Sequence, residues 1–229
     1  MLFVFWDIDG TLLTTGRAGI IAWERAVSEV CGKSLDFSQL GTAGFTDTEI
    51  AAVLARAGDP SASDDLAARL LRRYEVLLPG CLPLRTGGVL PGVVPILEHL
   101  RSLNHVHCSL LTGNTRAGAA AKLDYYGLQK YFSNGAFADG CNDRIEVAER
   151  AKAMVLSAAA TPSRARVFVV GDTPNDIRCA AAIGARAIAV ATGEYGAAEL
   201  RVHGPASVLE SLPAPELFVA LLQAPGVPS

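Results

Sequence analysis

The stretch LFVFWDIDGT at residues 2–11 decides the fold class, because it joins an apolar run directly to two closely spaced carboxylates. Residues 2–6 are apolar on both faces, which is typical of a strand buried inside a parallel sheet. Asp7 and Asp9 follow at once, and the two-residue period of a strand predicts that both side chains point to the same side. Such carboxylates repel each other and need a cation, a shared proton or hydrogen bonds. A plain Asp-Gly turn at Asp9 and Gly10 leaves Asp7 unexplained.

Further apolar runs resemble the first one, and helical patterns separate them along the chain. Strands are expected at residues 107–111, 166–170, 186–190 and, more weakly, 207–209. Helices are expected between them at residues 93–102, 116–125, 146–159 and 177–182. Strands that alternate with helices predict an α/β fold, with a Rossmann-like parallel sheet covered by helices on both faces. In such a sheet the active loops lie at the carboxyl ends of the strands.

Residues 14–87 break this rhythm, because their patterns are almost entirely helical. Helices are expected at residues 18–30, 46–57 and 63–78, followed by a return segment rich in proline and glycine. We interpret this segment as a small all-helical cap inserted after the first strand. The predicted domains are therefore an α/β core of residues 1–13 and 88–229 and a helical cap of residues 14–87. The alternative is one continuous α/β domain with long loops.

Composition narrows the class of protein. The 229 residues suit one domain or a core with a modest insertion, and a hydrophobic share of 50% excludes disorder. A net charge of −3 argues against a nucleic-acid binder, and no apolar stretch is long enough to cross a membrane. The first residues lack the basic start of a signal peptide, and five scattered cysteines suggest reduced thiols. We expect a cytoplasmic protein, either a monomer or a homodimer.

A second acidic motif, GDTPND at residues 171–176, follows another predicted strand. If the strands are parallel, Asp172 and Asp176 lie at the same sheet edge as Asp7 and Asp9. Four converging aspartates make an oxygen-rich site that suits Mg²⁺. The alternative is that the two later aspartates only complement the charge of a helix N-terminus.

A third motif, LLTGNT at residues 110–115, also follows a predicted strand. Its hydroxyl and its glycine backbone lie at a strand-to-helix turn and offer donors to a phosphate oxygen. The alternative is a plain helix cap made by Asn114 or Thr115.

In this order, the three motifs resemble the haloacid dehalogenase (HAD) superfamily of phosphohydrolases. The matching residues are DIDGT at 7–11, Thr112, and GDTPND at 171–176, with a helical cap inserted after the first motif. The segments PGV at 91–93 and LTGN at 111–114 are similar to the phosphoglycolate-phosphatase-like branch. The resemblance extends over nearly the whole chain.

The resemblance implies a Mg²⁺-dependent phosphatase that works through an aspartyl phosphate. Asp7 would be the nucleophile, and Asp9 would protonate the leaving alcohol and then activate water. The Mg²⁺ ion would be held by Asp7, the backbone carbonyl of Asp9, and Asp172. Asp176 would help directly or through water.

The resemblance also implies a set of phosphate-binding residues. Thr112 and the backbone N–H of Gly113 would hold a phosphate oxygen, and Asn114 either extends that contact or only caps the helix. The family places a cation upstream of its last motif. Arg144, at the entrance of an expected helix, is the first candidate here, and Lys152, deeper in the same helix, is the alternative.

Substrate choice would fall to the cap, where Arg17 and Thr46 are the candidates. Arg17 could pair with a carboxylate or second phosphate of the substrate, or it could be a surface arginine at a helix start. Thr46 belongs to the segment GFTD at residues 44–47, expected near the catalytic loop. The expected partner is a small phosphorylated metabolite, a phosphoglycolate-like monoester.

Three other functions compete with this one. A phosphomutase of the beta-phosphoglucomutase type would use the same core residues. A haloacid dehalogenase is disfavoured because halide needs no proton, whereas Asp9 supplies an acid. A receiver-type signalling domain is disfavoured because it is about half this length and has no helical insertion.

Overall fold

The computed structural model describes residues 1–34, 37, 42–58, 63–141, 143–159 and 161–224. Its centre is a six-stranded sheet in the order β5-β4-β1-β6-β7-β8, in which every neighbouring pair is parallel. The strands are β1 Leu2–Trp6, β4 Val106–Leu111, β5 Gly135–Ala136, β6 Arg166–Gly171, β7 Arg186–Val190 and β8 Ser207–Leu209. This sheet confirms the predicted Rossmann-like α/β class, although the short β5 was not predicted.

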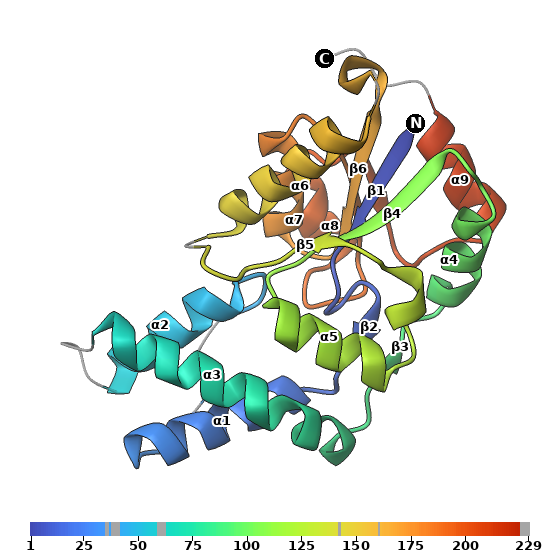
Figure 1. The fold of residues 1–229 in the computed structure, drawn as a ribbon. Helices are drawn as coiled ribbons and strands as arrows, with labels where there is room; N and C mark the ends of the chain where they lie inside the picture. The colour runs from blue at the N-terminus through green and yellow to red at the C-terminus, as the bar shows by residue number, and fades with distance from the viewer. Residues whose placement is uncertain (35–36, 38–41, 59–62, 142, 160, 225–229) are drawn as a thin grey trace.

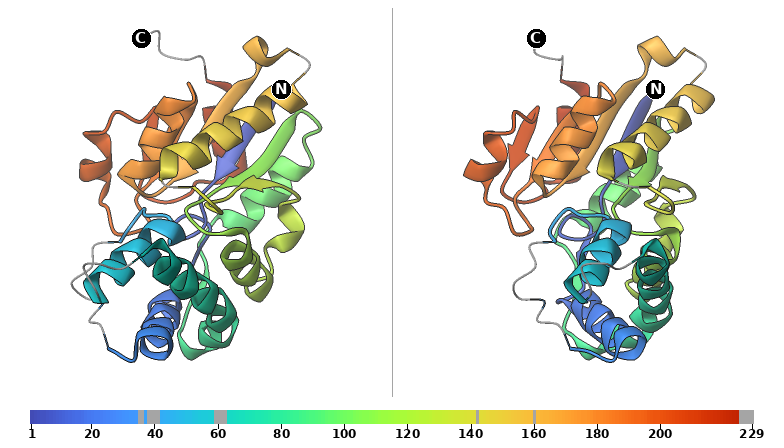
Figure 2. Two further views of the ribbon diagram at one scale, coloured as in Figure 1. Left: turned by 60° about the vertical axis from the view of Figure 1, so that its left-hand side comes forward. Right: turned by 90° about the vertical axis from the view of Figure 1, so that its left-hand side faces the viewer.

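Two helical layers cover the sheet, as Figures 1 and 2 show. One layer contains α4 Val93–Arg101, α5 Arg116–Tyr125 and α9 Pro215–Gln223, and the other contains α6 Arg144–Ala158, α7 Pro174–Ala182 and α8 Ala197–Arg201. The central strand β1 serves both layers because its side chains alternate. Leu2, Val4 and Trp6 pack toward the first layer, whereas Phe3 and Phe5 pack toward the second. This two-sided burial explains the continuous apolar run.

Three helices form a separate unit beside the carboxyl ends of the strands (Figure 2). They are α1 Ala18–Cys31, α2 Asp47–Gly58 and α3 Asp64–Cys81, and we call residues 18–81 the helical insertion. Its apolar residues form a cluster of their own, in which the rings of Trp23 and Tyr74 stack at a centroid distance of 4.0 Å. Two chain segments link it to the sheet, and they pair antiparallel as β2 Leu13–Thr14 and β3 Gly88–Val89.

Helix caps explain why α6 and α7 begin two to three residues earlier than expected. Helix α6 begins at Arg144 because the side chain of Asp143 accepts the N–H groups of Ile145 and Glu146. Helix α7 begins at Pro174 because Thr173 caps it.

Helix α9 was not predicted, and short 3₁₀ turns lie at Leu82–Leu84, Gln129–Tyr131 and Pro162–Arg164. Among the described residues, the helices are all too short or too polar to span a bilayer.

Candidate active site

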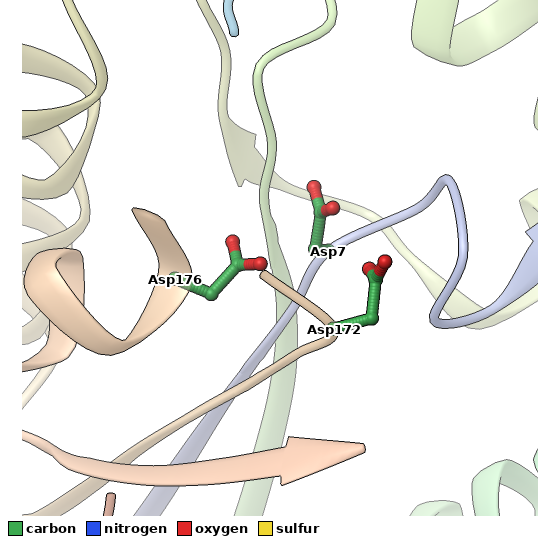
Figure 3. A group of neighbouring side chains, drawn as sticks. All are labelled: Asp7, Asp172 and Asp176. Carbon is green, nitrogen blue, oxygen red and sulfur yellow. The ribbon is translucent and has the colours of Figure 1, made fainter. Parts of the chain in front are cut away.

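Three buried aspartates meet where β1 and β6 end (Figure 3). Asp7 follows β1, Asp172 follows β6, and Asp176 lies in the first turn of α7. One carboxylate oxygen from each lies within 4.8 Å of the others. The parallel register of β1 and β6 brings the two strand ends together. The predicted convergence is therefore observed for these three aspartates.

The carboxylate of Asp172 is held by the Thr11 hydroxyl and lies close to the backbone of two glycines. Its Oδ1 accepts a hydrogen bond of 2.9 Å from the Thr11 hydroxyl. A Cβ atom on Gly193 would lie 1.8 Å from its Oδ2, and one on Gly10 would lie 2.3 Å from the same atom. Gly10 also has a φ of 78°, a left-handed conformation that favours glycine. The Asp-Gly turn of the first motif therefore makes room for the carboxylate of the last one.

Asp176 is engaged at both carboxylate oxygens. Its Oδ2 accepts the Thr173 N–H at 3.1 Å, and its own N–H donates to the Thr173 hydroxyl at 3.4 Å, which together form the capping box of α7. The same Oδ2 also accepts the Thr173 hydroxyl at 2.7 Å. Its Oδ1 pairs with the guanidinium of Arg144. These partners leave Asp176 less free than Asp7 or Asp172 to bind a metal directly.

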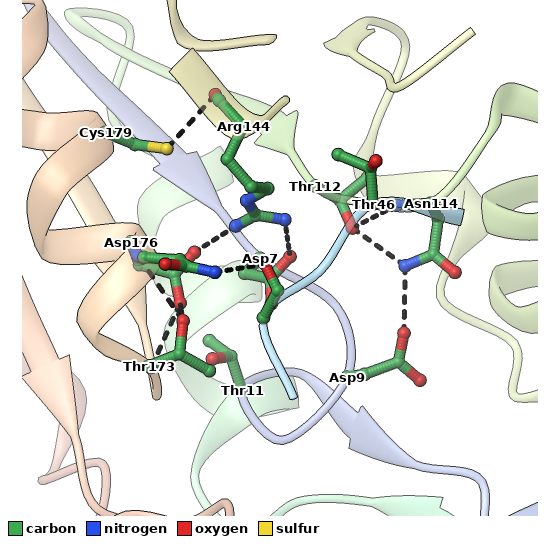
Figure 4. A network of polar contacts seen from close by, with 12 residues as sticks. Asp7, Asp9, Thr11, Thr46, Thr112, Asn114, Arg144, Thr173, Asp176 and Cys179 are labelled. Atoms are coloured by element: carbon green, nitrogen blue, oxygen red, sulfur yellow. Dashed lines mark hydrogen bonds and ion pairs between the residues drawn. The ribbon is translucent and has the colours of Figure 1, made fainter. Parts of the chain in front are cut away.

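Arg144 is the buried cation of this cluster. Its side chain is 4% exposed, and its Nη1 lies 3.5 Å from Oδ1 of Asp7 (Figure 4). Burial alone would lower the pKa of Arg144, but the carboxylates of Asp176 and Asp7 raise it above its ordinary value. Lys152, the alternative candidate, is 44% exposed and lies 3.5 Å from Glu149. The structure therefore places Arg144, and not Lys152, beside the expected nucleophile.

Burial also controls the charge of the three aspartates. Desolvation, followed by the nearby charge of Asp176, raises the pKa of Asp7 from its ordinary value of 3.8 to about 7. The same two causes raise the pKa of Asp172 well above its usual range. Three buried carboxylates face one guanidinium, so a divalent cation would offset the remaining negative charge. The all-oxygen donor set fits Mg²⁺.

Asp9 lies on the other side of the same cavity and has different partners. Its Oδ2 accepts 2.8 Å and 2.6 Å hydrogen bonds from Nδ2 of Asn114 and from Nζ of Lys122. The strand ends at Trp6, and the chain turns tightly through residues 8–13. The simple alternation expected for Asp7 and Asp9 therefore stops before Asp9. Both carboxyls line one cavity, but Asp9 is not part of the three-aspartate cluster.

Lys122 was missed by the sequence analysis. Its Nζ also donates to Oδ1 of Asn114 at 2.6 Å, and its side chain is only 6% exposed. A signal was present, since Lys122 occupies the apolar face of α5, three residues after Ala119 and next to Leu123. A lysine at a core-facing position is rare unless it is paired.

The expected phosphate loop joins β4 to α5. Thr112 is fully buried, and its hydroxyl accepts the side-chain amide of Asn114 at 2.8 Å (Figure 4). Thr115, not Asn114, caps α5 by accepting the N–H of Gly118. The Asn114 side chain instead connects Thr112, Asp9 and Lys122.

The helical insertion contacts this loop through the start of α2. The N–H of Asp47 donates to the carbonyl of Gly113 at 2.7 Å, and Oδ2 of Asp47 accepts the N–H of Thr115 at 2.8 Å. Thr48 donates to the carbonyl of Ala138 at 3.2 Å. Burial raises the pKa of Asp47 to about 7, although Lys122 opposes the shift. These contacts place the insertion directly over the expected phosphate loop.

A cavity of about 430 Å³ lies between the strand ends and the helical insertion. Asp7, Asp9 and Arg144 line it from the sheet side, and Trp23 of the insertion and Arg17, just before α1, line it from the other side. Arg17 has a φ of 71°, the only positive φ of a non-glycine residue in the described part of the chain. Thr46 does not line the cavity, because it is fully buried and its hydroxyl accepts the Glu49 N–H. Its neighbours Phe45 and Asp47 do line it.

The fold and the site define a class of protein. It is a Rossmann-like α/β protein with carboxylates gathered at the strand ends, beside a loop of the kind that binds anions. The chain belongs to the haloacid dehalogenase-like hydrolase family, whose model matches residues 4–181. A second model, for HAD-hydrolase-like proteins, matches residues 148–215. The chain is therefore an enzyme of a hydrolase family, as its motifs predict.

Solved structures share this fold across nearly the whole chain. CbbY from Rhodobacter sphaeroides in complex with phosphate is 18% identical, with a TM-score of 0.75 over 97% of this chain and 99% of its own. A predicted phosphoglycolate phosphatase from Haemophilus somnus is 15% identical, with a TM-score of 0.69 over 95% and 96%. A putative beta-phosphoglucomutase from Bacteroides vulgatus is 18% identical, with a TM-score of 0.70 over 97% and 89%. No curated protein matches the chain in sequence.

Proposed function

We propose that this protein is a Mg²⁺-dependent phosphatase that hydrolyses small phosphate monoesters through an aspartyl phosphate on Asp7. One observation carries the proposal: Asp7 and Asp9 line the same cavity, but each is held by its own buried cation. Family membership supports it, since hydrolases of this family are what the three motifs resemble. Two carboxyls in different surroundings can take different roles in one reaction.

The reaction would proceed in two steps, phosphoryl transfer to Asp7 and hydrolysis of the aspartyl phosphate. In the first, a carboxylate oxygen of Asp7 attacks phosphorus, the ester P–O bond breaks, and Asp9 gives its proton to the leaving oxygen. In the second, water attacks the same phosphorus while Asp9 takes its proton, and the bond to Asp7 breaks. Inorganic phosphate leaves, and both aspartates return to their starting states.

Other residues stabilise charge during transfer. Arg144 lies beside Asp7 and would pair with the transferred phosphoryl group. Thr112 and the N–H of Gly113 would hold one of its oxygens. Asp7, Asp172 and the backbone carbonyl of Asp9 would hold Mg²⁺, with Asp176 assisting through water because both of its oxygens have partners. The bound ion would reduce the repulsion between the carboxylate and the phosphate dianion.

The helical insertion would act as the cap. We propose the boundaries 14–87 for this domain and the remaining residues for the core. The cavity volume of about 430 Å³ suits a small phosphorylated metabolite, such as phosphoglycolate. Arg17 is the exposed cation on the cap side and would pair with a second acidic group of the substrate. We further propose a cytoplasmic location and a monomeric or homodimeric state, without a nucleic-acid or membrane partner.

Steady-state hydrolysis of p-nitrophenyl phosphate tests the proposal. We expect release of nitrophenol with Mg²⁺, loss of release with EDTA, and a loss of at least about 10³-fold in Asp7→Asn. A screen of phosphate esters, phosphoglycolate first, would follow. Unchanged release from Asp7→Asn would contradict the role of Asp7 as nucleophile.

Product analysis with other substrates separates the competing functions. A phosphomutase would need a sugar bisphosphate to start turnover and would return a sugar phosphate instead of inorganic phosphate. A dehalogenase would release halide from a haloacid without needing Asp9. Release of inorganic phosphate without any bisphosphate is the outcome we expect.

A further inference from the structure

Lys122 is buried in α5 and has two short hydrogen bonds. Its Nζ donates to Oδ2 of Asp9 and to Oδ1 of Asn114, both at 2.6 Å. The Nδ2 of Asn114 donates to the same Oδ2 of Asp9 at 2.8 Å. A closed triangle of donors and acceptors therefore joins these three residues. Each member fixes the orientation of the other two.

The charge of Lys122 is maintained by its neighbours. Burial alone would lower the pKa of this lysine, but the carboxylates of Asp9 and Asp47 raise it above its ordinary value. Lys122 is therefore an ammonium group at neutral pH. The motifs that identify the family do not include it, and the phosphate-stabilising role falls to Arg144 on the opposite side.

We propose that Lys122 is a positioning residue for Asp9. It holds the Oδ2 atom of Asp9 in the triangle and leaves the Oδ1 atom of Asp9 free to exchange a proton with the substrate. Oδ1 has no hydrogen-bond partner within the described ranges of the chain, and the Asp9 side chain remains 43% exposed to the cavity. The inference rests on the proposed phosphatase function.

This arrangement affects proton transfer in a defined way. When Asp9 gives its proton to the leaving oxygen, a carboxylate forms, and the two donors at Oδ2 stabilise it without having to move. Loss of Lys122 leaves one neutral donor and a rotatable carboxyl. The cost should then depend on how much the leaving group needs a proton. An alkoxide needs the proton, whereas p-nitrophenolate leaves without it.

The dependence on the leaving group provides the test. We would measure kcat/KM for a series of phosphate monoesters whose leaving groups run from p-nitrophenol to simple alkanols, in wild type and in Lys122→Met. The matched control is Lys130→Met, because Lys130 is 61% exposed and contacts Glu98 and the ring of Tyr131, away from the cavity. For Lys122→Met we expect a loss of about 100-fold at the alkanol end and less than about threefold for p-nitrophenyl phosphate.

A double-mutant cycle separates positioning from a general loss of structure. In an Asp9→Asn background, Lys122→Met should have little further effect on kcat/KM, because the residue that it positions is gone. If the Lys122→Met variant does not fold, the double variant Asp47→Asn with Lys122→Met takes its place. Its reference is then the single variant Asp47→Asn. That pair removes the buried carboxylate that would otherwise lose its cation, and asparagine still accepts the Thr115 N–H.

Two results would overturn the role of Lys122 while the phosphatase proposal stands. Equal losses for alkyl and nitrophenyl esters would make Lys122 a structural residue and would leave the phosphatase proposal intact. Additive losses from Asp9→Asn and Lys122→Met would show that the two residues act independently. A wild type that hydrolyses none of the esters would instead overturn the proposed function, and the role of Lys122 with it.

Discussion

The two sides of the cavity differ in charge and in origin. On the nucleophile side, three buried carboxylates gather beside Arg144, and every group comes from the sheet or from a helix that covers it. On the acid side, Asp9 shares Lys122 with Asn114, and Asp47 from the helical insertion contributes to the charge around that lysine. The first side has three buried carboxylates beside one cation, whereas the second has two carboxylates around one cation.

This difference explains how one cavity could separate phosphoryl transfer from proton transfer. Excess negative charge calls for a metal ion, which would fit the attack of Asp7 on a phosphate dianion. The two donors at Oδ2 hold the Asp9 carboxyl in one orientation and leave part of it accessible. Because Asp47 belongs to the insertion and its N–H donates to the carbonyl of Gly113, the charge on the acid side depends on where the insertion lies.

The largest effect should come from removing the cation of the nucleophile side. We expect Arg144→Met to lower kcat/KM for p-nitrophenyl phosphate by about 10²–10³-fold, because the transferred phosphoryl group loses its charged partner. Lys152→Met, on the same helix, should change it by less than about twofold. Equal losses in both variants would contradict the placement of Arg144.

A smaller effect is expected from a substitution beside the candidate metal site. The Cβ of Gly193→Ala would overlap Oδ2 of Asp172 and displace that carboxylate. We expect Mg²⁺ affinity to weaken by about 10–100-fold, as measured by the rise in thermal midpoint with Mg²⁺ concentration. Gly196→Ala is the control in the same loop, since its Cβ would meet only Glu199 at 3.4 Å. Unchanged affinity in Gly193→Ala would argue against Asp172 as a ligand.

Stability against pH tests the buried carboxyls on both sides. Asp7 and Asp47 each have a pKa of about 7 in the folded protein, against an ordinary value of 3.8. Between these values the folded protein binds more protons than the unfolded chain, so the free energy of unfolding falls as pH rises. For metal-free protein we expect a decrease on the order of a few kcal/mol from pH 4 to 8.

The substitution Asp47→Asn shows how much of the decrease in the free energy of unfolding comes from the acid side. It removes one of the two carboxyls and keeps an acceptor for Thr115, so the decrease with pH should become smaller. Denaturant unfolding at several pH values measures it. A stability that rises over this pH range in the metal-free wild type would contradict the assignment of both groups.

The smallest expected effect concerns the contact between the insertion and the phosphate loop. Asp47→Ala removes the acceptor of the Thr115 N–H, and we expect the free energy of unfolding to fall by about 1–3 kcal/mol at pH 5. Asp64→Ala, at an exposed first-turn position of α3, should cost less than about 0.5 kcal/mol. Similar losses in both variants would contradict the importance of this contact.

Local chemistry explains which parts could be predicted from the sequence. Strand β1 was predicted because both of its faces are buried, which leaves a continuous apolar run. Strand β5 was missed because two residues, Gly135 and Ala136, carry no pattern. Asp7, Asp172 and Asp176 could be brought together because the parallel sheet fixes where its strands end.

Long-range contacts could not be predicted in the same way. The position of Asp9 depends on the tight turn after Trp6, and its bond to Lys122 joins residues 113 positions apart. Nothing in the local sequence reports such a bond, and only the apolar face of α5 shows that Lys122 is buried. Thr46 was placed near the substrate by its neighbourhood, but its hydroxyl is used by the helix cap.

The division of roles between the two sides is tested most directly by trapping the covalent intermediate. With Asp9→Asn, p-nitrophenyl phosphate and Mg²⁺, the first step should proceed and the second should stall for want of a base. Mass spectrometry after an acid quench should then find one phosphoryl group on the tryptic peptide of residues 1–17, at Asp7, and none when Asp7→Asn is added. Nitrophenol release without any phosphoryl group on that peptide would contradict the account.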